Sequence, residues 1–305
     1  MSRWRCLPRR RRAAAVGVEA LSERALQAVD DAPKRTLETT SLSVLVPVYN
    51  EQYLVETSLR RLLALAESPL LTRIQIIVVD DCSSDHTPQV LRRFERSASD
   101  DAIAKVEWLF LRHERNAGKG AAIRTGLEHA SCDLTVIHDA DLEYHPRDLL
   151  PMVRLFLAEG ADAVFGSRFM AGGFKRALFF RHSIGNHILT FLCDLASDLN
   201  LTDMETCYKA FRREIIQSIP LNENRFGFEP EITVKISKRR LRVYEVGISY
   251  SGRTYEEGKK IGWKDGVRAL WCLAKYGIKE PVARRTLEFD RSVQPNAFVR
   301  LDENQ

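Results

Sequence analysis

The sequence has no apolar run of the roughly 20 residues that a helix needs to cross a bilayer. Its most apolar long stretch, residues 177–201, is interrupted by charged and polar side chains, namely Arg181, His182, Asn186, His187 and Asp194. The N-terminal residues also lack the apolar core of a secretory signal. We therefore expect no membrane-spanning helix and a cytoplasmic location.

Cysteines are few and widely spaced, and no C-x-x-C pair occurs among them. The six are Cys6, Cys82, Cys132, Cys193, Cys207 and Cys272. This spacing suits neither a zinc site nor a disulfide framework. We expect these side chains to be small buried groups in a reducing compartment.

Positive charge is not in excess outside the N-terminus. Six arginines, at positions 3, 5 and 9–12, precede the first acidic residue, Glu19, and the rest of the chain has 40 basic and 41 acidic residues. The formal charge of +5 therefore reflects the segment 1–40, which we interpret as a basic, flexible extension. Because a nucleic-acid-binding domain carries a basic footprint, we expect no nucleic-acid partner.

Two nucleotide-binding signatures are also absent. No G-x-G-x-x-G follows the first predicted strand, which argues against a dinucleotide, and Asn116-Ala-Gly-Lys-Gly is not a Walker A sequence. The missing G-x-G-T-R type of N-terminal loop disfavours a nucleotidyltransferase. Gly118 and Gly120 suit a close approach of two backbones, and Lys119 suits a phosphate.

Strand and helix patterns alternate from residue 41 onward. The predicted strands cover residues 41–50, 74–81, 106–112, 134–137, 161–168 and 242–250. The predicted helices cover residues 51–66, 87–96 and 121–130, a segment beginning at Pro146, and residues 256–278. This alternation predicts an α/β fold with a mostly parallel, Rossmann-like sheet flanked by helices, over a domain of residues 41–255.

Two carboxylates follow the short predicted strand 134–137. Asp139 and Asp141 stand one residue apart, where the strand meets the next loop. In an open α/β sheet, ligands bind at the carboxyl ends of the strands. Such a pair of oxygen ligands suits Mg²⁺ or Mn²⁺ carrying a diphosphate. A turn in which the aspartates cap a helix is the alternative interpretation.

Polar residues also follow the first two predicted strands. Pro47-Val-Tyr-Asn-Glu51 ends the first, and Asp80-Asp81 ends the second. A carboxylate at a strand end can accept hydrogen bonds from ribose hydroxyls or a nucleobase N–H. Ser83, Ser84 and Asp85 can instead cap the following helix.

Together these motifs resemble glycosyltransferase family 2, the inverting nucleotide-sugar enzymes with the GT-A fold. V-P-V-Y-N-E, V-V-D-D-x-S-x-D-x-T, R-N-x-G-K-G-x-A-x-x-x-G, D-A-D and G-S-R-F occur in order. The likeness covers roughly residues 42–260 and is greatest to the dolichyl-phosphate mannosyltransferase and polyprenyl-phosphate glucosyltransferase branch. It implies a metal-dependent transfer of a hexose from a nucleotide sugar, UDP-glucose or GDP-mannose in type, to a lipid phosphate.

The resemblance also implies roles for individual residues. Those implied to bind the nucleotide and its diphosphate are Pro47, Tyr49, Asn50, Glu51, Asp81, Lys119, Arg253 and Lys259. Asp139, Asp141 and Glu143 are the implied metal ligands. The implied catalytic and acceptor residues are Asp139, Asp141, Arg168, Arg181, Asp203 and Glu231.

Arg168 and Arg181 favour a phosphate acceptor, because a guanidinium binds phosphate through two hydrogen bonds. A lipid phosphate is already anionic, whereas a hydroxyl acceptor needs a general base. One alternative is therefore transfer to a hydroxyl in glycan or cell-envelope synthesis, with Asp203 or Glu231 as the base. Another is a nucleotide-sugar-binding protein without catalysis. The sequence departs from the family at Thr206, Tyr208 and the segment after Arg253, which bears on the sugar and the acceptor.

The segment 256–280 has the pattern of an amphipathic helix, and 281–305 is a polar tail. Apolar positions recur at helical spacing, at Trp263, Val267, Leu270, Trp271, Ala274 and Ile278. Basic residues flank them, at Lys259, Lys260, Lys264, Arg268 and Lys275. This pattern suits peripheral contact with the cytoplasmic membrane face through snorkelling lysines. Packing of the helix on its own domain is the alternative.

Overall fold

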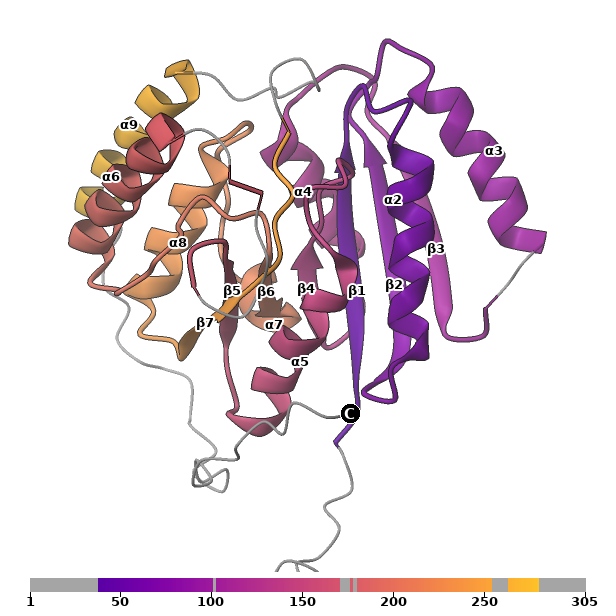
Figure 1. The fold of residues 1–305 in the computed structure, drawn as a ribbon, viewed down its shortest axis with the longest axis horizontal. Helices are drawn as coiled ribbons and strands as arrows, with labels where there is room; N and C mark the ends of the chain where they lie inside the picture. Colours follow the sequence, from indigo (N-terminus) through magenta and orange to yellow (C-terminus); the bar gives the residue numbers. More distant parts are fainter. Residues whose placement is uncertain (1–37, 101–102, 171–175, 178–179, 254–262, 280–305) are drawn as a thin grey trace, which may run out of the picture. The chain divides into compact units, whose positions relative to one another are not determined.

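A seven-stranded sheet in the order β3-β2-β1-β4-β6-β5-β7 forms the centre of the fold (Figure 1). The computed structural model describes residues 38–100, 103–170, 176–177, 180–253 and 263–279. The strands are β1 (Thr40–Val48), β2 (Leu71–Asp80), β3 (Val106–Arg112), β4 (Leu134–Ile137), β5 (Ala163–Ser167), β6 (Lys209–Arg212) and β7 (Val243–Gly247). All strand pairs are parallel except those made by β6. The prediction of a mostly parallel α/β sheet is confirmed.

Helices pack on both faces of this sheet, with α2 on the near side and α4 on the far side in Figure 1. The α-helices are α2 (Val55–Leu62), α3 (Thr87–Asp100), α4 (Lys119–His129), α5 (Leu149–Ala158), α6 (Phe180–Ser197), α7 (Arg213–Gln217), α8 (Phe228–Lys238) and α9 (Trp263–Lys279). Two 3-10 helices, η1 (Leu63–Glu67) and η2 (Pro146–Asp148), extend α2 and precede α5. The central strands β1, β2 and β4 are buried valine, isoleucine and leucine runs, as strands covered on both faces require.

Among the described strands, β6 is the one that the sequence pattern does not predict, and helices α6, α7 and α8 were not predicted either. Strand β6 lies antiparallel between β4 and β5, with Ala210 opposite Val136 and Lys209 opposite Phe165. Its reversed direction brings the residues that precede it, 203–208, to the sheet edge where β4 and β5 end. This edge therefore collects the loops after β1, β2, β4 and β5 together with the segment before β6.

Helices α6, α8 and α9 pack against one another and enclose a second, smaller apolar core. Its buried members are Cys193, Met204, Val234, Cys272, Leu273 and Tyr276. Within the described residues, no helix is long and apolar enough to cross a membrane. Four of the free cysteines, Cys132, Cys193, Cys207 and Cys272, are buried, as expected from the sequence.

One carboxylate, that of Glu223, fastens α9 to the rest of the fold. It accepts hydrogen bonds from Arg268 (2.6 Å), Lys275 (2.9 Å) and the Tyr276 hydroxyl (2.8 Å), and its side chain is 3% exposed. Burial opposes ionisation, but the hydrogen bonds from Lys275, Arg268 and Tyr276 lower the pKa of Glu223 to about 2. Because charge-assisted hydrogen bonds are the stronger kind, this contact should contribute measurably to stability.

We expect Glu223→Gln to lower the free energy of unfolding by roughly 1–3 kcal/mol at pH 7. The folded-state pKa lies below the ordinary value of 4.5, so the contribution is present above about pH 4.5. It should be lost as the pH falls towards 2. Urea unfolding of wild type and Glu223→Gln between pH 2 and pH 7 measures the difference in their free energies of unfolding. A difference at pH 2 as large as that at pH 7 would contradict the prediction.

Candidate active site

Hydrogen bonds from backbone N–H groups to side-chain oxygens join the loop after β1 to the segment that follows β2. The Asn50 N–H donates to Ser83 Oγ (2.9 Å), and the Glu51 N–H donates to Thr87 Oγ1 (2.8 Å). The Ser84 N–H in turn donates to Asn50 Oδ1 (2.9 Å). Asn50 adopts a left-handed φ of 52°, which asparagine tolerates better than most residues. Tyr49, beside it at the end of β1, is 39% exposed.

Asp81, predicted to bind the nucleotide, holds the glycine-rich loop. Its carboxylate accepts the N–H groups of Ala117 (2.8 Å) and Gly118 (2.7 Å), and it lies 2.7 Å from His113 Nδ1. Gly118 has a φ of 98°, and a Cβ there would collide with the Asn224 carbonyl. The expected close approach of two backbones is therefore present, and it fixes the start of α4.

Lys119, the first residue of α4, lies between two acidic side chains. Its Nζ is 3.0 Å from Asp139 Oδ2 and 3.1 Å from Glu229 Oε1. Burial favours the neutral amine, but the charges around it, that of Asp139 foremost, raise the pKa of Lys119. Burial likewise opposes ionisation of Asp139, yet Lys119 holds the pKa of that carboxyl below its usual value. The pair is therefore ionised at neutral pH.

Arg253 connects the loops after β1 and β4. Its guanidinium lies 2.9 Å from Asp141 Oδ2, 3.2 Å from Glu143 Oε1 and 3.6 Å from Glu51 Oε2. Glu143 also accepts the Tyr250 hydroxyl at 2.9 Å. Three carboxylates that the sequence assigns to the donor and its metal thus share one guanidinium.

The chemistry of these donors fits a hard divalent cation. Asp139, Asp141 and Glu143 offer only oxygen, the ligand type that Mg²⁺ and Mn²⁺ prefer. Burial, followed by the charges of Asp139 and Glu143, raises the pKa of Asp141 to about 7, so negative charge is in excess there. No three ligating side chains of the described residues are arranged to hold a metal by themselves. Further ligands would therefore come from a bound diphosphate and water.

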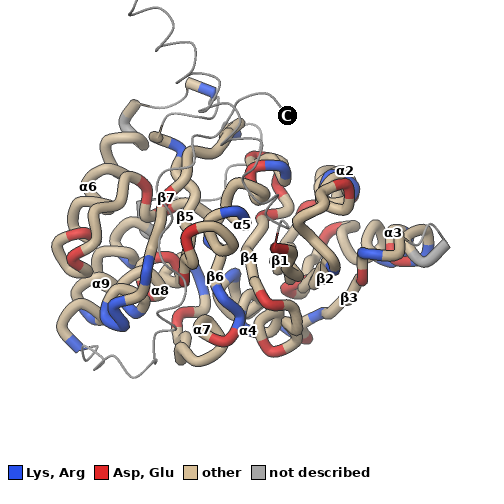
Figure 2. The backbone as a smooth tube through the Cα atoms, turned by 90° about the horizontal axis from the view of Figure 1, so that it is seen from below, with Lys and Arg blue, Asp and Glu red and all other residues tan. Residues whose placement is uncertain are grey.

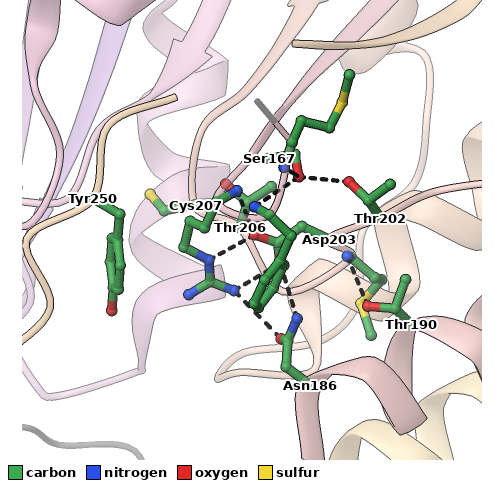
Figure 3. A network of polar contacts seen from close by, with 12 residues as sticks. Ser167, Asn186, Thr190, Thr202, Asp203, Thr206, Cys207 and Tyr250 are labelled. Atoms are coloured by element: carbon green, nitrogen blue, oxygen red, sulfur yellow. Dashed lines mark hydrogen bonds and ion pairs between the residues drawn. The ribbon is translucent and has the colours of Figure 1, made fainter. Parts of the chain in front are cut away.

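Arg168, directly after β5, is held through three hydrogen bonds by Asp203, which Figure 3 labels beside Asn186. Its backbone N–H, Nε and Nη2 donate to the Asp203 carboxylate at 3.0, 2.6 and 2.7 Å. Asn186, on α6, donates to Asp203 Oδ1 at 3.2 Å. Asp203 is fully buried, and although burial opposes ionisation, Arg168 lowers the pKa of Asp203. The two predicted acceptor residues form one ion pair.

Three further predicted site residues are Glu231, Arg181 and Lys259. Glu231 is fully buried, and it accepts the N–H groups of Asn222 and Glu223 at 2.8 Å and the Lys235 ammonium at 2.7 Å. It therefore holds the loop that contacts the glycine-rich segment. The backbone of Arg181 belongs to α6, but its side chain lies outside the described residues, as does Lys259.

Three side chains at this edge were not identified from the sequence. Asn186 completes the ion pair of Arg168, and Glu229 contacts Lys119. Glu205 lies in the segment before β6, two residues after Asp203. The two glutamates each stand two residues from a residue that the sequence analysis named, Asp203 or Glu231, but only the antiparallel path of β6 and the start of α8 bring them to this edge.

A family model described as "Glycosyl transferase family 2" matches residues 43–219. An uncharacterised protein of Methanocaldococcus jannaschii is 30% identical over 75% of this chain and 89% of its own length. A dolichol-phosphate mannosyltransferase of Pyrococcus furiosus is 27% identical over 72% of this chain and 59% of its own. An undecaprenyl-phosphate 4-deoxy-4-formamido-L-arabinose transferase of Salmonella paratyphi A is 31% identical over 72% of this chain and 62% of its own length. This chain thus spans about three fifths of the two named transferases.

Solved structures resemble the fold as well. Glucosyl-3-phosphoglycerate synthase from Mycobacterium tuberculosis, in complex with Mn²⁺, UDP and glucosyl-3-phosphoglycerate, superposes with a TM-score of 0.57. It is 20% identical, and the match covers 78% of this chain and 80% of that chain. Its complex with uridine-diphosphate superposes with a TM-score of 0.58 at 19% identity. At such identities the likeness shows the fold, which is the GT-A arrangement.

We expect Asp203→Asn to lower the free energy of unfolding by roughly 3–5 kcal/mol, because it leaves Arg168 buried without its counter-charge. The matched control is Glu107→Gln, since Glu107 is 54% exposed in a surface pair with Arg73. That change should cost less than about 1 kcal/mol. Chemical unfolding of the three proteins measures both effects, and equal losses would contradict the prediction.

Proposed function

This chain belongs to glycosyl transferase family 2, and we propose that it transfers a hexose from a nucleotide sugar to a polyprenyl or dolichyl phosphate with inversion. The observation that carries the proposal is the sequence of chemical groups along one sheet edge. Loops suited to a nucleotide follow β2 and β1, carboxylates suited to a cation and diphosphate follow β4, and the buried Arg168 follows β5. The names of the two transferase relatives support a lipid-phosphate acceptor.

The proposed reaction is a single displacement. An acceptor phosphate oxygen forms a bond to the anomeric carbon while the bond from that carbon to the diphosphate oxygen breaks. The electron pair leaves with the nucleoside diphosphate, and attack from the opposite face inverts the configuration. Since the acceptor is already anionic, no group has to remove a proton from it.

Residues of this chain have two tasks in that step. Lys119 and Arg253 lie against the carboxylates of β4, where they can stabilise negative charge as it builds on the leaving diphosphate. A divalent cation, held by Asp141 with help from Asp139 and Glu143, would add Lewis-acid stabilisation of the same charge. Arg168 would orient the acceptor phosphate, and Asp203 with Asn186 would hold Arg168 in place.

The contacts of Asp203 disfavour the hydroxyl-acceptor alternative with Asp203 as the base. Both of its oxygens accept hydrogen bonds from Arg168, and the protein around it is closed to solvent. A general base needs a free lone pair directed at the proton that it removes. Asp203 is better suited to position Arg168 than to accept a proton.

Helices α6 and α9 carry the apolar surface that a lipid acceptor implies. Exposed apolar residues recur along α6 at Phe180, Ile184, Ile188, Phe191 and Leu195. On α9 they are Val267, Leu270, Trp271 and Ile278. Basic positions also lie along α9 (Figure 2), and Arg268 and Lys275 contact the Trp271 ring. Peripheral membrane contact through α6 and α9 is therefore part of the proposal.

A nucleotide-release assay tests the transfer. With Mn²⁺ and either UDP-glucose or GDP-mannose, a short polyprenyl phosphate should raise the release of free nucleoside diphosphate at least tenfold. Asp141→Ala should abolish that release, whereas Arg168→Gln should chiefly raise the KM for the lipid phosphate. Turnover that ignores the lipid but responds to a saccharide would move the acceptor to a hydroxyl, and no turnover with any donor would refute the proposal.

Vesicle binding tests the surface of α6 and α9. Replacing Phe191 and Leu195 by aspartate should reduce co-sedimentation with vesicles of anionic lipid at least fivefold, because both side chains are more than 60% exposed and apolar. The matched control replaces Tyr53, which is 86% exposed on another part of the fold, by aspartate. Equal binding by all three proteins would contradict membrane contact through α6.

A further inference from the structure

Glu205, in the segment before β6, and Glu229, near the start of α8, each have a carboxylate oxygen without a partner in the described part of the chain. Glu229 is 5% exposed, and its Oε1 contacts Lys119, yet its Oε2 is buried with no hydrogen-bond partner among the described residues. Oε1 of Glu205 and Oγ1 of Thr206 are likewise buried and unpartnered within that part of the chain. Because buried polar atoms are rarely left unpaired, such a group points to a missing polar ligand.

The backbone that presents Glu205 is firmly held. Lys209, which is fully buried, donates to the carbonyls of Met204 (2.7 Å) and Thr206 (2.6 Å). These contacts fix the chain on both sides of Glu205. Burial, followed by the nearby charge of Glu229, raises the pKa of Glu205 to about 7, in keeping with two neighbouring carboxyl groups. Glu205, Thr206 and Glu229 thus form a group of side chains whose buried oxygens lack partners among the described residues, and the contacts of Lys209 hold the two members before β6 in place.

The place of this group along the sheet identifies what it would bind. Asp139, joined to Glu229 through Lys119, marks the diphosphate end at β4. Arg168 at β5 marks the acceptor end, and β6 lies between these two strands. In the proposed reaction, the part of the substrates between the diphosphate and the acceptor phosphate is the transferred sugar ring.

We propose that Glu205 and Glu229 recognise the hydroxyl groups of the transferred sugar and so select the donor by its configuration. The inference rests on the proposed function and names the residues that read the sugar. A carboxylate accepts hydrogen bonds from sugar hydroxyls. If a hydroxyl has the wrong configuration, the carboxylate oxygen that it would have met stays unpaired. Sites built in this way discriminate strongly between substrates that differ in one hydroxyl.

The test compares epimeric donors that share a nucleotide. Calorimetry with the full chain and Mn²⁺ would measure the Kd of UDP, UDP-glucose and UDP-galactose, and of GDP, GDP-mannose and GDP-glucose. For the nucleotide that it binds, wild-type protein should have different Kd values for the two donors whose sugars are epimers. Glu205→Gln should reduce that ratio about tenfold and leave the Kd of the plain nucleoside diphosphate within twofold.

Two further variants complete the design. Glu205→Asp keeps the carboxylate but withdraws its oxygens by one methylene, so it should also lose discrimination between epimers. It replaces Glu205→Gln as the test variant if Glu205→Gln does not fold. Glu214→Gln is the control, because Glu214 is 87% exposed on α7. An unchanged epimer ratio, a wild-type protein that does not distinguish epimers, or an equal loss for the plain nucleotide would overturn the inference. If neither UDP nor GDP binds, the proposed function itself fails.

Discussion

The compensation of buried negative charge is the constraint on which this site depends. Asp139, Asp141, Glu143, Asp203 and Glu229 all lie at one edge of the sheet, where an isolated carboxylate would be costly to bury. Each is paired with a cation: Lys119 bridges two of them, Arg253 bridges two more, and Arg168 pairs with the fifth. Removing one cation would leave carboxylates uncompensated, so the acidic edge and its basic residues form one unit.

This arrangement suits a reaction in which negative charge moves from a sugar–phosphate bond onto a leaving diphosphate. Fixed cations stabilise such charge without reorganising during the step, which is the main electrostatic advantage of a folded site over water. Neighbouring residues keep these cationic side chains in place. Asp81 holds the loop that begins α4 and hence Lys119, while Asn186 supports the ion pair of Arg168. Positioning residues thus support those that would touch a substrate.

Local patterns were sufficient to predict the parallel part of the sheet and the carboxylates after β4. The apolar run 134–137 matches β4 in full, because a strand buried on both faces leaves a strong signal in the sequence. Residues 51–54, in contrast, were expected to be helical but precede α2. The Glu51 N–H bonds to Thr87, thirty-six residues away, and no local pattern contains that contact. Strand β6, four residues long and charged at both ends, was missed because its pairing with β4 and β5 is equally non-local.

The antiparallel insertion of β6 explains why the roles of Asp203 and Glu205 depend on the three-dimensional structure. A parallel strand at this position would carry its preceding residues to the opposite edge of the sheet, far from the end of β4. The reversed strand instead inserts residues 203–208 between Asp139 and Arg168, and Lys209 fixes them there. One reversal of chain direction therefore brings a second set of buried polar groups to the acidic edge. The order of strands along the sheet then corresponds to the order of nucleotide, diphosphate, sugar and acceptor in the proposed reaction.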